Sequence, residues 1–177
     1  MLTVTEALAE TKTIESRIEK RREAILRYLV RDARMRDPLE SDGGSVEFVR
    51  KERQAISDLE FRLVQIRTAI QAVNLRSTLT VQEETRTVSE WLNWRREVSE
   101  KQKAFLGRMA SAITQMRQKA VAVGGTLAAS VESAKPGDVI SVVNEVELSG
   151  EIEHIELVLG ELDGKLSLFN ATITIDI

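Results

Sequence analysis

The longest regular pattern of apolar positions lies between residues 49 and 73. Apolar residues recur there at alternating steps of three and four, with one polar member; the set is Val49, Glu52, Ile56, Leu59, Leu63, Ile66, Ile70 and Val73. This repeat predicts a helix over about 46–74 that buries one stripe against a second long helix, in the manner of a coiled coil. The stripe would suit the core of a globular bundle equally well, so both alternatives stay open.

A helix over about 4–36 is predicted upstream. Thr3 and Glu6 have the spacing of a capping box, in which each side chain satisfies a backbone N–H of the other. Apolar residues then recur at helical steps, at Leu8, Ile14, Ile18, Ile25 and Leu29. The pattern is interrupted at Thr11 and again at Arg21 or Arg22. A proline and two glycines in residues 37–44 predict a turn, so we expect the helices to pair antiparallel as a hairpin.

A third helix is predicted over about 88–123, after a second capping box at Thr87 and Glu90. Its expected buried stripe is Trp91, Trp94, Val98, Phe105, Met109, Ala112, Met116 and Val123. We interpret the two tryptophans as packing anchors, because no polar group that could hold a ligand lies beside them in the sequence. Gly124 and Gly125 are typical of a helix end.

The remaining segments mix helical and extended patterns. Short strands are predicted at 78–81 and 139–143, and a helix over about 145–169 follows from Ile152, Ile155, Leu159, Leu162, Leu166 and Phe169. Residues 170–177 alternate as a strand does, and its partner edge could be 78–81, 139–143 or the same tail of another copy. We therefore expect a mainly α fold of two long antiparallel helical hairpins with short β segments. Residues 1–125 would form the helical region and 126–177 an acidic C-terminal segment.

Charge is distributed unevenly along the chain. Residues 17–36 carry eight basic and three acidic side chains, a net charge of +5, whereas residues 132–177 carry a net charge of −8. Such complementarity can steer one part of a molecule onto another, or one copy onto the next. The arginine-rich helix could also contact nucleic acid, but an isoelectric point near 5.4 and the absence of a nucleic-acid-binding motif weigh against this interpretation.

The sequence offers little catalytic chemistry. The 177 residues contain no cysteine and one histidine, which excludes disulfides, thiol nucleophiles and multi-histidine metal sites within one chain. His154 has Glu151 as its nearest partner and no converging nucleophile, so we expect it to be solvent-exposed. The carboxylates from Glu145 to Glu156 lack the spacing of a calcium-binding loop. We expect no enzymatic activity, cofactor or metal, and no apolar run approaches the roughly 20 residues that span a membrane.

Three segments carry a resemblance to a known family. The middle of the septicolysin-like small helical proteins is similar to residues 68–75 and 88–95. The final element of that family is similar to residues 161–172. The chain departs from the family's final motif because Ser167 stands in place of a glutamine and no tryptophan follows Asn170. The resemblance implies a helical hairpin bundle, often oligomeric, that occurs in bacterial and phage genomes. It implies no defined activity.

These observations together favour a structural function. The hypothesis is a non-enzymatic assembly protein that self-associates through helical seams and a C-terminal strand, as a component of a bacteriophage head, neck or tail assembled in the host cytoplasm. Its partners would be further copies and other structural proteins of that assembly. The candidate interaction residues are Arg17, Arg21, Arg22, Arg31, Ile173, Ile175 and Ile177. The alternative is a cytosolic binding or regulatory module whose basic helix engages an acidic partner or nucleic acid.

Overall fold

The structure, a computed structural model, describes residues 1–128 and 130–176. The predicted mainly α fold is confirmed, with four long helices and short strands. The chain forms two compact units. The first unit combines Met1–Ser77 with Ser167–Ile177, and the second is Thr78–Leu166. This division differs from the sequence-based boundary near residue 125, because the C-terminal residues pair with the N-terminal ones.

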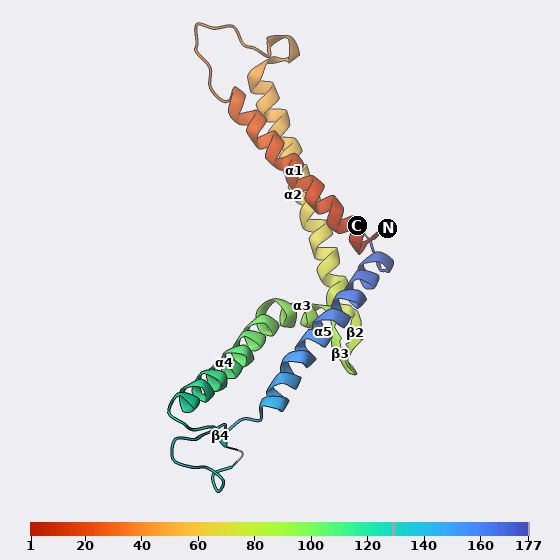
Figure 1. Ribbon diagram of the computed structural model, residues 1–177. Coiled ribbons are helices and arrows are strands. Elements are labelled where there is room, and N and C mark those ends of the chain that lie inside the picture. The colour runs from red at the N-terminus through yellow and green to blue at the C-terminus, as the bar shows by residue number, and fades with distance from the viewer. Residues whose placement is uncertain (129, 177) are drawn as a thin grey trace. The chain divides into compact units, whose positions relative to one another are not determined.

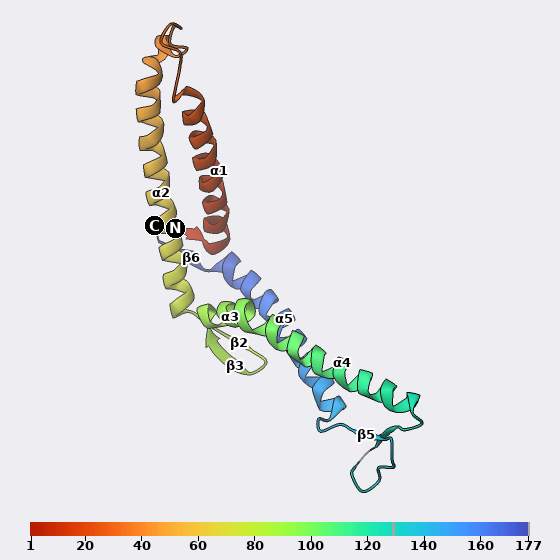
Figure 2. The same ribbon diagram turned by 90° about the vertical axis from the view of Figure 1, so that its left-hand side faces the viewer.

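The first unit is built on an antiparallel hairpin of α1 (Val4–Tyr28) and α2 (Gly44–Arg76), which lie side by side (Figures 1 and 2). The buried apolar residues of its core are Val4, Ala7, Ile14 and Ile18 from α1 and Ile66, Ile70 and Val73 from α2. The apolar stripe of α2 therefore faces α1 of the same chain, where its last three residues are buried and Val49, Ile56, Leu59 and Leu63 are half-buried. The predicted capping box is present, because the Glu6 N–H donates to the Thr3 hydroxyl and the Thr3 N–H donates to the Glu6 carboxylate.

The inner face of α1 differs from the predicted one. Leu8 and Leu29, which we expected inside, are 42% and 57% exposed, whereas Ala7 and Thr11 are buried. Thr11 can be buried because its hydroxyl donates to the Leu8 carbonyl at 2.8 Å. Alanine and threonine contribute little to an apolar pattern. The pattern therefore favoured Leu8 as the buried position in place of its neighbour Ala7.

Helix α1 also ends eight residues before the predicted residue 36. Just beyond it, the Asp32 carboxylate accepts the backbone N–H and the guanidinium of Arg34, a local arrangement that competes with helical hydrogen bonds. The connection contains one short 3₁₀ turn, η1 (Glu40–Asp42), and then Gly43 and Gly44, whose φ angles of 92° and 87° favour glycine. The turn is thus longer than the sequence pattern indicated.

The two chain ends pair with each other. Strand β1 (Leu2–Thr3) runs antiparallel to β6 (Thr174–Ile175), with Leu2 opposite Ile175, and the N and C labels accordingly lie together in both views (Figures 1 and 2). The partner of the tail is therefore none of the three edges that we considered. The strand is also shorter than predicted, because the preceding helix continues to Thr172.

The second unit begins with a β-hairpin that the sequence revealed only in part. Strand β2 (Thr78–Val81) was predicted, and its partner is β3 (Glu84–Thr87), which was not. The two-residue turn consists of Gln82 and Glu83, both at positive φ. Because this geometry usually recruits asparagine or glycine, the pair gave no turn signal. Trp91 is buried beneath the hairpin and donates its indole N–H to the Leu79 carbonyl at 2.9 Å.

The predicted third helix is interrupted by a π turn. It consists of α3 (Val88–Trp94), the π-helical η2 (Arg95–Ser99) and α4 (Glu100–Ala122). A π turn inserts one extra residue and rotates the following helix relative to the preceding one. The predicted stripe is consequently wrong at several positions after Trp94, although Met109 packs on the core: Leu106 is buried where Phe105 was expected, and Ser99 where Val98 was expected.

Within the second unit, α4 packs antiparallel to α5 (Glu145–Thr172), of which residues up to Leu166 belong to this unit (Figure 1). Their shared core is built on Leu106, Leu148 and Ile155, against which Met109 and Ile113 also pack. The connection holds a parallel pair of two-residue strands, β4 (Leu127–Ala128) and β5 (Val139–Ile140). The strand predicted at 139–143 is thus shorter.

Candidate interaction surfaces

Two of the predicted arginines form ion pairs across the first hairpin. Arg21 donates to Glu52, and Arg22 donates to Glu60 at 2.9 Å. Two further pairs of the same kind join Glu10 to Arg62 and Glu15 to Arg67. Two carboxylates of α2 thus pair with two of the basic side chains of α1, and two carboxylates of α1 pair with arginines of α2.

Among the residues that the structure describes, the other two predicted arginines, Arg17 and Arg31, form no ion pair across the hairpin. Arg17 is exposed on α1 and forms no ion pair within the described part of the chain. Arg31 lies in the connection after α1, where it donates to the Met35 carbonyl at 2.9 Å and lies 3.8 Å from Asp37. The four arginines thus do not form one basic site.

Two of the three predicted tail isoleucines, Ile173 and Ile175, make contacts within the chain itself. Ile175 is 2% exposed and opposite Leu2, and the Ile173 carbonyl accepts the Val4 N–H at 3.0 Å. Ile177 lies outside the described residues. Ile173 and Ile175, the described residues of the predicted isoleucine edge, therefore contribute to packing within the first unit.

Asp37 organises the connection between α1 and α2. Its carboxylate accepts the hydroxyl and backbone N–H of Ser45, at 2.6 and 2.9 Å, and the N–H of Leu39 at 2.9 Å. These hydrogen bonds, those from Ser45 first, lower the pKa of Asp37 to about 2. An ionised Asp37 therefore supports the start of α2.

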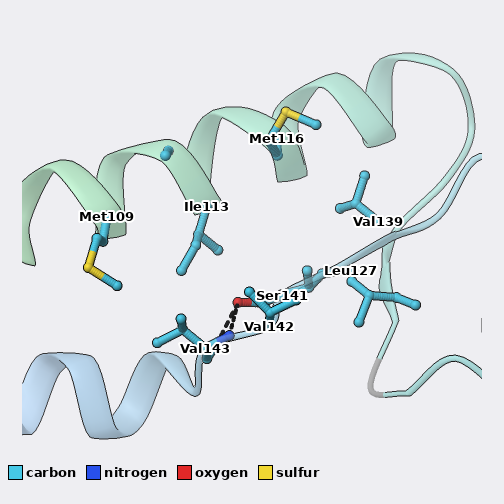
Figure 3. Close-up of a pocket in the computed structure, with 10 residues that line it drawn as sticks. Met109, Ile113, Met116, Leu127, Val139, Ser141, Val142 and Val143 are labelled. Atoms are coloured by element: carbon cyan, nitrogen blue, oxygen red, sulfur yellow. Dashed lines mark hydrogen bonds between the residues drawn. The ribbon is translucent and has the colours of Figure 1, made fainter.

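An open apolar pocket of about 310 Å³ lies in the second unit, between α4 and the segment that precedes α5 (Figure 3). Met109, Ile113 and Met116 line it from α4, and Val139 and Val143 line it from the other side. The Ser141 hydroxyl donates to the Val143 carbonyl at 2.6 Å, so this polar group is satisfied locally. Val142, at the rim, is 99% exposed. The sequence pattern did not reveal this pocket, because residues 139–143 resembled an ordinary strand.

Apolar side chains also remain exposed along the side of α4. Phe105 is 54% exposed and Met116 48% exposed, and both were expected in the core. Val98 and Val123 are exposed as well. Rotation by the π turn places this set outside, and the part around Met116 borders the pocket. We call Phe105, Ala112, Met116 and Val123 the α4 stripe.

The charges of the second unit are divided between its two long helices. Residues 95–122 carry a net charge of +5 and residues 145–166 a net charge of −6. Among the described residues, Lys103 and Arg117 of α4 form ion pairs with Glu156 and Glu145 of α5, and Arg95 of the π turn pairs with Asp163. The hydrogen bond from Lys103 to Glu156 raises the pKa of Lys103. Several charges on both helices are left for other contacts.

The groups considered for chemistry do not converge. His154 and Glu151 are both exposed on α5. Among the described residues, no group of three or more acidic or histidine side chains is arranged to hold a metal ion. In the same part of the chain, no helix combines the length and apolar character needed to cross a membrane.

Comparisons with protein-family models, curated proteins and solved structures found no match.

Proposed function

We propose that this chain is a non-enzymatic structural protein that self-associates as part of a larger assembly. The observation that carries the proposal is the α4 stripe, in which Phe105 and Met116 are about half exposed and Ala112 and Met116 also line the open apolar pocket. A row of exposed apolar side chains on a folded protein is typical of a protein–protein contact, because covering it removes apolar area from water.

The route of association differs from the one that the sequence pattern favoured. The apolar stripe of α2 packs on α1, and Ile175 packs in the first unit. Ile66, Ile70 and Val73 of that stripe are buried, as is Ile175, so association through these residues would require opening of the chain's own core. The outward surfaces of the second unit are the better candidates.

The proposed setting is a bacteriophage particle, in its head, neck or tail, and the proposed partners are further copies and other structural proteins of the particle. The support for this setting is the resemblance of residues 68–75, 88–95 and 161–172 to septicolysin-like proteins, combined with the helical hairpins that the chain forms.

The test is the mass of the purified protein in solution. Sedimentation velocity and light scattering from about 1 to 100 µM are expected to show mass that increases with concentration. A stable monomer throughout this range, also in the presence of candidate partner proteins, would contradict the proposal.

A second candidate is supported by a separate observation. Arg17, Lys20 and Arg27 are exposed on α1 and form no ion pair with the described residues. They could engage an acidic protein or nucleic acid. A gel-shift series with duplex DNA and RNA distinguishes the candidates, because phosphate contacts weaken steeply as salt rises. Binding that is lost when these three residues are changed to glutamine would favour the second candidate.

A further inference from the structure

The α4 stripe has a regular helical spacing and a basic margin. Phe105, Ala112 and Met116 follow one another at steps of seven and four, so they share one side of the helix, and Val123, which caps its C-terminal end, continues the spacing. Arg108 and Lys119 are exposed beside them and form no ion pair among the described residues. The α4 stripe is thus an apolar surface with positively charged side chains along one margin.

A complementary surface lies on the outer side of α5. Val146, Gly150, Leu157, Gly160 and Gly164 share one side of the helix, together with Glu153 at the intervening position. The core residues Leu148, Ile155 and Leu162 occupy the opposite side. We call this set the α5 stripe.

Packing inside the chain does not require the glycines of the α5 stripe. A Cβ atom at Gly150, Gly160 or Gly164 would meet nothing within 4 Å, and none of the three has a positive φ. Glycine within a helix costs stability relative to alanine. The three positions therefore form shallow hollows on an exposed surface.

The α5 stripe carries negative charge. Glu153 lies within it and Glu147 lies beside it, and both are exposed and form no ion pair with the described residues. Two α5 stripes would therefore bring like charges together, and so would two α4 stripes. An α4 stripe facing an α5 stripe brings opposite charges together.

The spacing of bulky and small residues also matches. Phe105 and Met116 are eleven positions apart and Gly150 and Gly160 are ten, which at 1.5 Å per residue correspond to roughly 16 and 15 Å. Two protruding side chains can thus occupy two hollows at the same time.

We propose that the α4 stripe of one copy packs against the α5 stripe of a second copy of this chain. This inference rests on the proposed function as a self-associating protein. The contact is heterologous, since each copy presents a different surface to each neighbour. Such contacts produce rings or filaments and not a closed dimer, so mass should increase beyond that of two copies.

Charge reversal gives a sharp test. Variant A carries Arg108→Glu and Lys119→Glu, and variant B carries Glu147→Lys and Glu153→Lys. In a solution of either variant alone, the α4 stripe and the α5 stripe of neighbouring copies carry charges of the same sign. Each variant is therefore expected to need at least 10-fold higher concentration to associate. In an equimolar mixture, every contact between alternating copies is complementary again, so association should return to the wild-type level.

A steric variant tests the same contact without changing charge. Gly160→Leu has open space in the folded chain and is expected to raise thermal stability slightly, yet to weaken association at least 10-fold. The matched control is Gln118→Leu, an exposed position on the side of α4 away from the stripe, which should associate like the wild type. Circular dichroism establishes that every variant is folded.

The outcomes separate the inference from the proposed function. A monomeric wild type would overturn both. A wild type that associates, with variants A and B and Gly160→Leu associating equally well, would overturn this contact and leave self-association standing. Failure of the A and B mixture to recover, when each variant alone is impaired, would also contradict the heterologous contact.

Discussion

Arg21 on α1 and Glu52 on α2 form an ion pair, with one guanidinium nitrogen donating to both carboxylate oxygens at 2.8 and 2.7 Å. Each residue interrupts the apolar stripe of its own helix, and the two interruptions meet. A shift of one helix along the other would place either charge against apolar side chains. The pair therefore favours one register of the hairpin, as single polar positions do in coiled coils.

We expect the single substitutions Arg21→Leu and Glu52→Leu each to lower the free energy of unfolding by about 1 kcal/mol, because each leaves a partly buried charge without its partner. The double variant should regain or exceed wild-type stability. Urea denaturation measures all three. The exposed pair Arg22 and Glu60 serves as control, and its alanine variants should change stability by less than about 0.5 kcal/mol. Additive losses in the double variant would contradict a shared contact.

Asp37 should make the first unit sensitive to acid. Its pKa falls from 3.8 to about 2 in the folded chain, so its contribution to stability is present above pH 4 and is lost as the pH falls toward 2. Replacement by Asn removes this contribution. The difference in denaturation midpoint between wild type and Asp37→Asn should be largest near neutral pH and shrink below pH 4. A difference that is constant from pH 7 to pH 2 would contradict the hydrogen bonding to Ser45.

Ser99 should stabilise the π turn. It is buried, and its hydroxyl donates to the Arg95 carbonyl at 2.8 Å, within the segment where regular helical bonding changes. Ser99→Ala is expected to lower stability by about 1–2 kcal/mol, because that carbonyl loses its donor. Ser111 makes the same type of bond to Gly107 at an exposed position, so Ser111→Ala should be nearly neutral. Equal effects in thermal denaturation would show that burial of Ser99 does not matter.

Ile175 should contribute to folding and not to association. Because its side chain is 2% exposed, Ile175→Ala is expected to lower the stability of the first unit by about 2–4 kcal/mol. The concentration at which copies associate should stay unchanged, as measured by sedimentation at a temperature where the variant is folded. Ile173→Ala, at a half-buried position, should have the smaller effect on stability. Loss of association with unchanged stability would restore the tail as an interface.

The amino-acid sequence by itself determined the local features. Both capping boxes, at Thr3 and Thr87, are formed as predicted, because they depend on residues three positions apart. The α2 stripe and the four helices follow from periodicity within single segments. The mainly α class could therefore be predicted without knowledge of tertiary contacts.

Tertiary structure decided which surfaces are inside and which are outside. The extra residue of the π turn, which no local signal marked, exchanged Phe105 for Leu106 in the core and created the candidate surface. Leu2 and Ile175 stand at opposite ends of the chain, and their pairing depends on how the intervening helices return. Such relationships depend on residues far apart in sequence, and periodicity within one segment carries no information about them.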